Sequence, residues 1–122
     1  MAKLSDHFRR HELACHCCGQ CNVSPRLIEA LEELRGLLSD SPIHITSGCR
    51  CVSHNDAVGG VHYSRHTVGE AADIAVQGHD PVEVAMAAEK VTAIRNGGIG
   101  VYGSFTHIDV GYGDDRPARW QG

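Results

Sequence analysis

Apolar residues recur at helical spacing in two long stretches of the chain. The first begins at Ser24-Pro25, where Ser can cap the helix and Pro fits its first position. The second begins at Asp80-Pro81, with a Glu positioned to complete a capping box, and stops at Asn96-Gly97-Gly98. The pattern predicts helices over about residues 25–38 and 81–95. The buried face of the first helix is expected to consist of Leu27, Ile28, Leu31, Leu34, Leu37 and Leu38.

Shorter stretches have the features of β-strands. Residues 43–46 alternate apolar and polar, with His44 pointing away from the two isoleucines, and residues 71–76 form an apolar run. Residues 99–102 and 105–110 read as two strands of a hairpin joined at a Gly-Ser turn. Strands that alternate with two amphipathic helices predict an α+β fold, a small and mainly antiparallel sheet covered by helices on one side.

The remaining segments add no long element. At 122 residues we expect one domain over residues 1–122, with a Cys-rich N-terminal segment, residues 1–22, packed on it. Residues 52–65 form a loop rich in His, Asn and Gly, and its His54 and His62 are expected to make loop hydrogen bonds rather than bind metal. The tail from Gly111 is polar apart from an aromatic residue near each end.

Charge and hydropathy exclude several classes of protein. Eleven basic and fifteen acidic residues give a formal net charge of −4, which argues against nucleic-acid binding driven by phosphate contacts. The sequence contains no run of 18 apolar residues that could span a membrane. The first ten residues lack the apolar segment of a signal peptide, so we expect synthesis in the cytoplasm without one.

Six cysteines are many for a chain of this length. Four lie within residues 15–21, and two flank Arg50. The set Cys15, Cys17, Cys21 and Cys51 suits a structural zinc held by four thiolates, and a pair of disulfides fits equally well. Either chemistry would link the N-terminal segment to the turn around Arg50.

Three residues form a candidate catalytic zinc site, namely His66, Asp73 and His107. Asp73 and His107 lie on predicted strands that can pair, and His66 ends a loop that can fold over that sheet. A carboxylate in an apolar strand is costly unless it meets a cation, a metal or several donors. Catalytic zinc commonly has three protein ligands and one water. The alternative is that each histidine is an ordinary structural residue.

Several motifs, in order along the chain, resemble the zinc D-Ala-D-Ala carboxypeptidases of peptidase family M15. The motifs are Ile45-Thr46-Ser47-Gly48-x-Arg50, His54-Asn55-x-x-Val58-Gly59-Gly60, Ser64-x-His66-x-x-Gly69-x-Ala71-x-Asp73, Gly98-Ile99-Gly100-Val101-Tyr102, Phe105-x-His107-Ile108-Asp109-Val110 and Arg119-Trp120. The third motif is also similar to the zinc site of the hedgehog signalling domain, which shares the fold. The resemblance implies that His66, Asp73 and His107 bind one catalytic zinc ion and that Arg50 binds substrate or stabilises the transition state.

Two positions depart from the family pattern. Ser104 stands where many of these enzymes have a carboxylate general base, and Cys49 stands where an aromatic residue is common. Asp109 shares a strand face with His107, so it could serve as the base or orient a ligand; the base role is the preferred interpretation. Glu70 is the alternative carboxylate.

The expected function is therefore a bacterial or phage zinc metallopeptidase that hydrolyses peptidoglycan stem peptides. It would act as a D-Ala-D-Ala carboxypeptidase or as an L,D-type endopeptidase resembling an endolysin. We expect a monomer whose partner is the cell-wall peptide, with no nucleic acid and no membrane, reaching the wall by release or by a phage-type route. A non-catalytic zinc-binding module of hedgehog-like fold and a four-cysteine zinc-knuckle interaction protein remain as alternatives.

Overall fold

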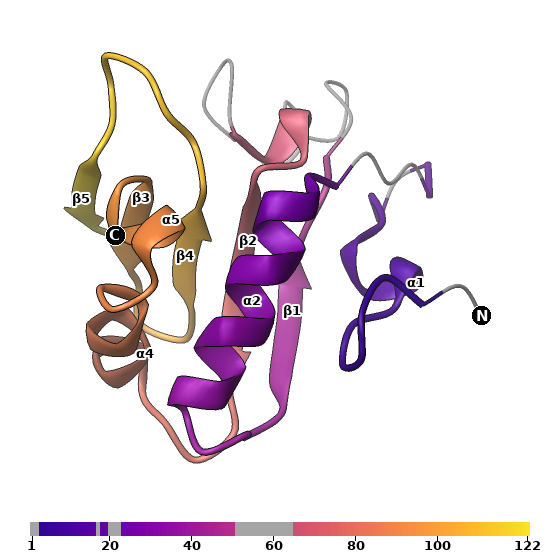
Figure 1. Ribbon diagram of the computed structural model, residues 1–122, viewed down its shortest axis with the longest axis horizontal. Helices are drawn as coiled ribbons and strands as arrows, with labels where there is room; N and C mark the ends of the chain where they lie inside the picture. The colour runs from indigo at the N-terminus through magenta and orange to yellow at the C-terminus, as the bar shows by residue number, and fades with distance from the viewer. Residues whose placement is uncertain (1–2, 17, 20–22, 51–64) are drawn as a thin grey trace.

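The structure, a computed structural model, describes residues 3–16, 18–19, 23–50 and 65–122. These residues form one five-stranded sheet with several helices and one 3-10 turn (Figure 1). In chain order the elements are α1 (Arg10–Leu13), α2 (Pro25–Leu37), β1 (Ile43–Ser47), η1 (Arg65–Val68), β2 (Ala71–Val76), α4 (Pro81–Ala88), α5 (Thr92–Arg95), β3 (Gly98–Val101), β4 (Thr106–Asp109) and β5 (Ala118–Gln121). The fold is thus of the mixed α and β class that the sequence predicts.

The sheet has the strand order β1-β2-β4-β3-β5. The β1-β2, β2-β4 and β3-β4 pairs are antiparallel, and β3 and β4 form the predicted hairpin. The β3-β5 pair is parallel. The sequence did not predict β5, because Ala118–Gln121 is only four residues long and lies in a mainly polar tail. Its strand conformation comes from pairing with β3, which is distant in sequence.

Helix α2 follows the prediction closely. Ser24 accepts a hydrogen bond from the backbone N–H of Arg26, and Pro25 occupies the first turn. Leu27, Leu31 and Leu34 are fully buried, whereas Leu37, expected on the same face, is 46% exposed. The helix ends at Leu37, and Leu38 turns back into the core in its place.

The second predicted helix is interrupted. Asp80 and Glu83 form the expected capping box, but α4 ends at Ala88 and α5 begins only at Thr92. Between them, Val91 has an extended backbone and is buried together with Ile94. Residues 89–91 include no Gly or Pro, so the apolar periodicity of the sequence gave no sign that the helix is interrupted there. Val84 and Ala88 on α4 are buried together with Val91 and Ile94, so apolar residues on both sides of the break still face the core.

The helices α2, α4 and α5 lie on one side of the sheet, and their apolar faces form the core with the strand residues that point toward them (Figure 1). On β2 these are Ala72, Ile74 and Val76. Because strand side chains alternate, Asp73 points to the opposite side, and the same holds for His107 and Asp109 around Ile108. The sheet therefore separates its apolar core from a polar cluster.

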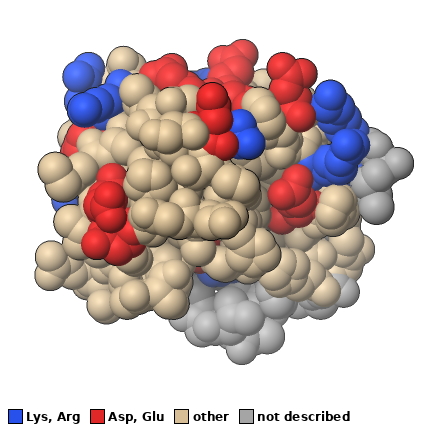
Figure 2. Space-filling model, turned by 90° about the horizontal axis from the view of Figure 1, so that it is seen from below, with Lys and Arg blue, Asp and Glu red and all other residues tan. Residues whose placement is uncertain are grey.

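The described part of the N-terminal segment packs against this framework. Phe8 and Leu13 are buried in the core, and the backbone N–H of Cys49 donates to the carbonyl of Leu13 at 2.7 Å. His7 contacts the carboxylate of Glu32 on α2 through its backbone N–H at 2.8 Å and through its ring. Across the described ranges no helix has the length and apolarity to cross a bilayer. Figure 2 shows acidic and basic side chains in separate small groups on the face that it draws.

Replacing Leu31 with alanine should destabilise the protein by about 2–5 kcal/mol, because the fully buried side chain leaves a cavity between α2 and the sheet. Leu37→Ala on the same helix is the matched control, since Leu37 is nearly half exposed whereas Leu31 is fully buried. Urea unfolding of both variants measures the difference. Equal midpoints for the two would contradict the packing described here.

Candidate metal centre

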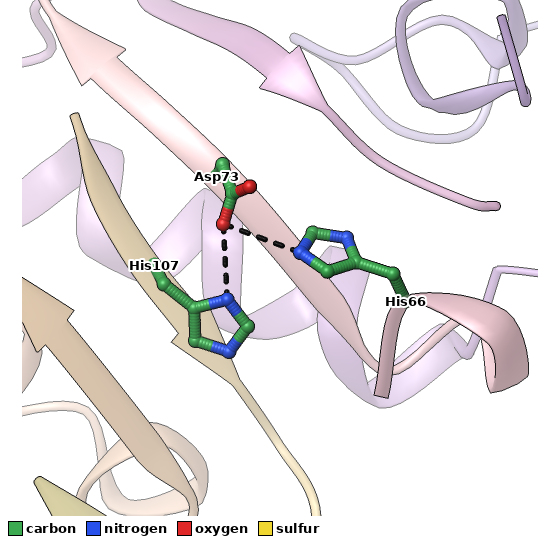
Figure 3. A group of neighbouring side chains, drawn as sticks. All are labelled: His66, Asp73 and His107. Atoms are coloured by element: carbon green, nitrogen blue, oxygen red, sulfur yellow. Dashed lines mark hydrogen bonds and ion pairs between the residues drawn. The ribbon is translucent and has the colours of Figure 1, made fainter. Parts of the chain in front are cut away.

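Two neighbouring strands and one short turn bring three potential metal ligands together. Asp73 on β2 lies directly opposite His107 on β4 in the antiparallel register. His66 comes from η1, which leads into β2. The turn is anchored by its backbone: the carbonyl of His66 accepts from the N–H of Arg50 at 3.0 Å and from that of Gly69 at 3.3 Å. Figure 3 shows both imidazole rings pointing at the Asp73 carboxylate.

The two imidazole rings converge on one carboxylate oxygen of Asp73. Nε2 of His66 lies 3.2 Å and Nδ1 of His107 2.9 Å from Oδ1 of Asp73. One ligand atom from each residue lies within 4.8 Å of the others, and all three residues are buried. Among the described residues this is the group of His, Cys, Asp and Glu side chains arranged to hold a metal ion.

The outer nitrogen of each ring has a partner that fixes the ring. Nδ1 of His66 lies 2.7 Å from the carbonyl of Gly48, so it carries a proton and donates it. Nε2 of His107 lies 2.8 Å from Oδ2 of Asp109. Histidines that bind metals are usually oriented in this way.

The donor set fits a divalent cation. With the outer nitrogens donating to Gly48 and Asp109, the inner nitrogens face a carboxylate oxygen with their lone pairs. Three acceptors this close repel one another unless a proton or a cation lies between them. Two imidazoles and a carboxylate are typical zinc ligands.

The pKa values of the buried carboxylates and of His107 are shifted by the groups that contact them in the cluster. With protons rather than a cation between the three groups, burial alone would raise the pKa of Asp73, but hydrogen bonds donated by His107 and His66 outweigh it and hold that pKa well below its usual range. For Asp109, burial is likewise outweighed by hydrogen bonds from His107 and Arg116, which lower its pKa. For His107, burial favours the neutral ring, but the two carboxylates raise its pKa. The cluster therefore keeps both carboxylates charged and favours positive charge between them.

Arg50 lies at the edge of the cluster. Its Nη2 approaches Oδ2 of Asp73 at 3.4 Å, and its Nε donates to the hydroxyl of Ser47 at 3.2 Å. The side chain is 14% exposed. Arg50 thus contacts the oxygen of Asp73 that the two histidines leave unused, and it places a positive charge beside the site.

Asp109 lies behind His107. Its carboxylate contacts the outer nitrogen of the ring, accepts two hydrogen bonds from Arg116 and one from the backbone N–H of Gly111, and is fully buried. Glu70, the alternative carboxylate, pairs with Arg65 at 3.3 Å. Ser104 lies exposed in the turn between β3 and β4.

Sequence reasoning missed Arg116 and the contact of Trp120 with the site. The resemblance pointed to Arg119-Trp120, but Arg119 pairs with Glu89 near the protein surface. Trp120 lies against the His107 ring, with ring centroids 4.9 Å apart. A Cβ on Gly100 would lie 2.3 Å from the indole nitrogen, so glycine is what leaves room for this ring. No spacing within the polar tail distinguishes Arg116 from Arg119.

The predicted cysteine site is only partly described. Cys15 and Cys49 are buried, whereas Cys17, Cys21 and Cys51 lie outside the described residues, as do His54 and His62. The cross-link between the N-terminal segment and the turn around Arg50 stays a prediction.

Thiol titration of the native protein should find fewer than six reactive cysteines, because either a disulfide pair or a thiolate-bound zinc would protect some of them. Titration after reduction, and again after chelation, separates the two chemistries. Six thiols that react freely without either treatment would exclude any cross-link.

Comparison with known proteins agrees with this geometry. The family model described as Peptidase M15 matches residues 6–109, a range that includes all three residues of the cluster. The zinc D-Ala-D-Ala carboxypeptidase of Streptomyces albus G is 35% identical over 86 residues, which cover 70% of this chain and 34% of that relative. The match thus spans about a third of the relative's length. With a buried His, Asp and His set inside the matched range, the chain belongs to the M15 family of zinc peptidases.

Proposed function

We propose that the protein is a zinc-dependent metallopeptidase that hydrolyses peptidoglycan stem peptides, with a fold of the hedgehog and D-Ala-D-Ala peptidase type. One observation carries the proposal: ligand atoms of His66, Asp73 and His107 converge within 4.8 Å inside a chain of the M15 family. The substrate class is inferred from the relative, whose name states a D-Ala-D-Ala carboxypeptidase. The protein would act on the cell wall after release or delivery.

Each residue of the site has a role in this proposal. His66, Asp73 and His107 would hold the zinc ion, which supplies a water nucleophile at neutral pH and polarises the scissile carbonyl. Arg50 would bind a substrate carboxylate or the developing oxyanion, because its guanidinium lies beside Asp73 and a guanidinium binds carboxylates and oxyanions strongly. Asp109 would orient His107 rather than take a proton, since its carboxylate is occupied by His107 and Arg116.

A non-catalytic zinc-binding module is the second candidate. Two observations favour it: an exposed Ser104 occupies the position of the family's usual base, and the carboxylate of Asp109 is engaged behind His107. Both candidates require the same metal site, so only hydrolysis distinguishes them.

The test is hydrolysis of purified stem peptides, followed by mass spectrometry of the products. Activity should disappear with a chelator and return with zinc. Loss of a single terminal D-Ala would identify a carboxypeptidase, and cleavage within the stem an endopeptidase. Zinc bound in stoichiometric amount, without cleavage of any stem peptide, would support the non-catalytic module instead.

A further inference from the structure

The loop between β4 and β5 places a guanidinium against the buried carboxylate of Asp109. Nε of Arg116 donates to Oδ1 and Nη2 donates to Oδ2, both at 3.0 Å. Such a two-point pair constrains orientation as well as distance. The Arg116 side chain is 12% exposed, and its guanidinium lies over the Trp120 ring, 6.0 Å from the centroid. The pair is therefore a largely buried part of the fold rather than a surface contact.

The space around Asp109 leaves its carboxylate little freedom. Gly98 lies opposite Asp109 in the β3-β4 register, and a Cβ there would come within 2.3 Å of Oδ2. The backbone N–H of Gly111 donates to Oδ1 at 3.1 Å. Contacts from a backbone amide, a guanidinium and an imidazole thus hold this carboxylate in one position.

We infer that Arg116 is a positioning residue for the metal centre, acting through Asp109 on His107. Arg116 fixes the carboxylate, and the carboxylate fixes the His107 ring so that Nδ1 faces Asp73 and His66. The inference rests on the proposed zinc site. It predicts that a residue without contact to any metal ligand sets the zinc affinity, as outer partners of metal-binding histidines do.

The same loop reaches the turn that carries His66, but through weaker contacts. Asp115 pairs with Arg65 at 2.7 Å and with Arg116 at 3.2 Å, and its side chain is 63% exposed. Exposed ion pairs of this kind contribute little. The effect on the metal centre is therefore assigned to the Arg116–Asp109 pair.

Arg116→Gln tests the inference through zinc affinity, measured by competition with a chromophoric chelator. We expect a loss of about 10- to 100-fold relative to the unaltered protein. The matched control is Arg119→Gln, which also removes an arginine paired twice with a carboxylate, here Glu89, but away from the cluster. Its zinc affinity should stay within about twofold. Equal affinities of Arg116→Gln, Arg119→Gln and the unaltered protein would overturn the inference.

A double-mutant comparison separates positioning from a general structural role. If Arg116 acts through Asp109, Arg116→Gln should add almost nothing to the affinity loss of Asp109→Asn, because coupled residues are not additive. Additive losses would overturn the inference. The zinc affinity of Arg116→Lys should lie between those of Arg116→Gln and the unaltered protein, because an ammonium cannot form the two parallel hydrogen bonds of a guanidinium.

Two further measurements keep these outcomes interpretable. Thermal unfolding and the NMR signal of the His107 Nε2–H proton show whether each variant is folded and whether the ring keeps its partner. If Arg116→Gln does not fold, zinc affinity is compared in two other variants. One is Arg116→Lys, and the other is the double variant with Asp109→Asn, which leaves no unpaired buried charge. Zinc binding without hydrolysis in the unaltered protein would contradict the proposed peptidase but leave the affinity comparison intact. No zinc binding at all would overturn both.

Discussion

Replacing His107 with alanine should remove zinc binding and peptide hydrolysis together. The ring supplies one of three converging ligand atoms and lies directly opposite Asp73 in the sheet. Losing a ligand should cost more zinc affinity than the roughly 10- to 100-fold loss typical of an outer partner. Zinc content after dialysis and turnover of a stem peptide measure the two effects.

His44→Ala provides the matched control, because His44 is an exposed histidine on β1. That variant should keep its zinc and its turnover. If His107→Ala retained stoichiometric zinc with an affinity like that of His44→Ala, the His66, Asp73 and His107 assignment would be wrong. Metal held elsewhere, as in the predicted cysteine site, would then account for the zinc.

Asp109→Asn should lower zinc affinity by about 10- to 100-fold, with activity restored by excess zinc. The reason is geometric: the carboxylate contacts the outer nitrogen of His107 at 2.8 Å and is paired with Arg116. An amide keeps the shape but weakens the charge-assisted hydrogen bond to the ring. Zinc titration with turnover at low and saturating zinc measures the result.

The alternative role of Asp109 has a different signature. A general base would leave zinc affinity unchanged in Asp109→Asn and lower turnover by roughly 100- to 10,000-fold at every zinc concentration. Unchanged affinity together with unchanged turnover would contradict both roles and direct attention to Glu70. Either outcome would also remove the basis for the role of Arg116.

Features that depend on neighbouring residues could be predicted from the sequence. The cap at Ser24 with Pro25 determined where α2 begins, and its leucine spacing determined which face is buried. Strand alternation put Asp73 on the side of the sheet away from Ile74, and put His107 and Asp109 on one face. These properties follow from backbone geometry within a few residues, so they hold before the chain is folded.

Other features depended on which distant segments meet. The break between α4 and α5 is not marked by any Gly or Pro between them, and β5 forms because β3 offers it an open edge. The roles of the two arginines of the tail were decided in the same way, Arg116 by contact with Asp109 and Arg119 by contact with Glu89. Local sequence determined which residues could act as ligands and partners. Only the tertiary structure decided which of them meet, because side-chain pairing depends on strand register and loop path rather than on spacing along the chain.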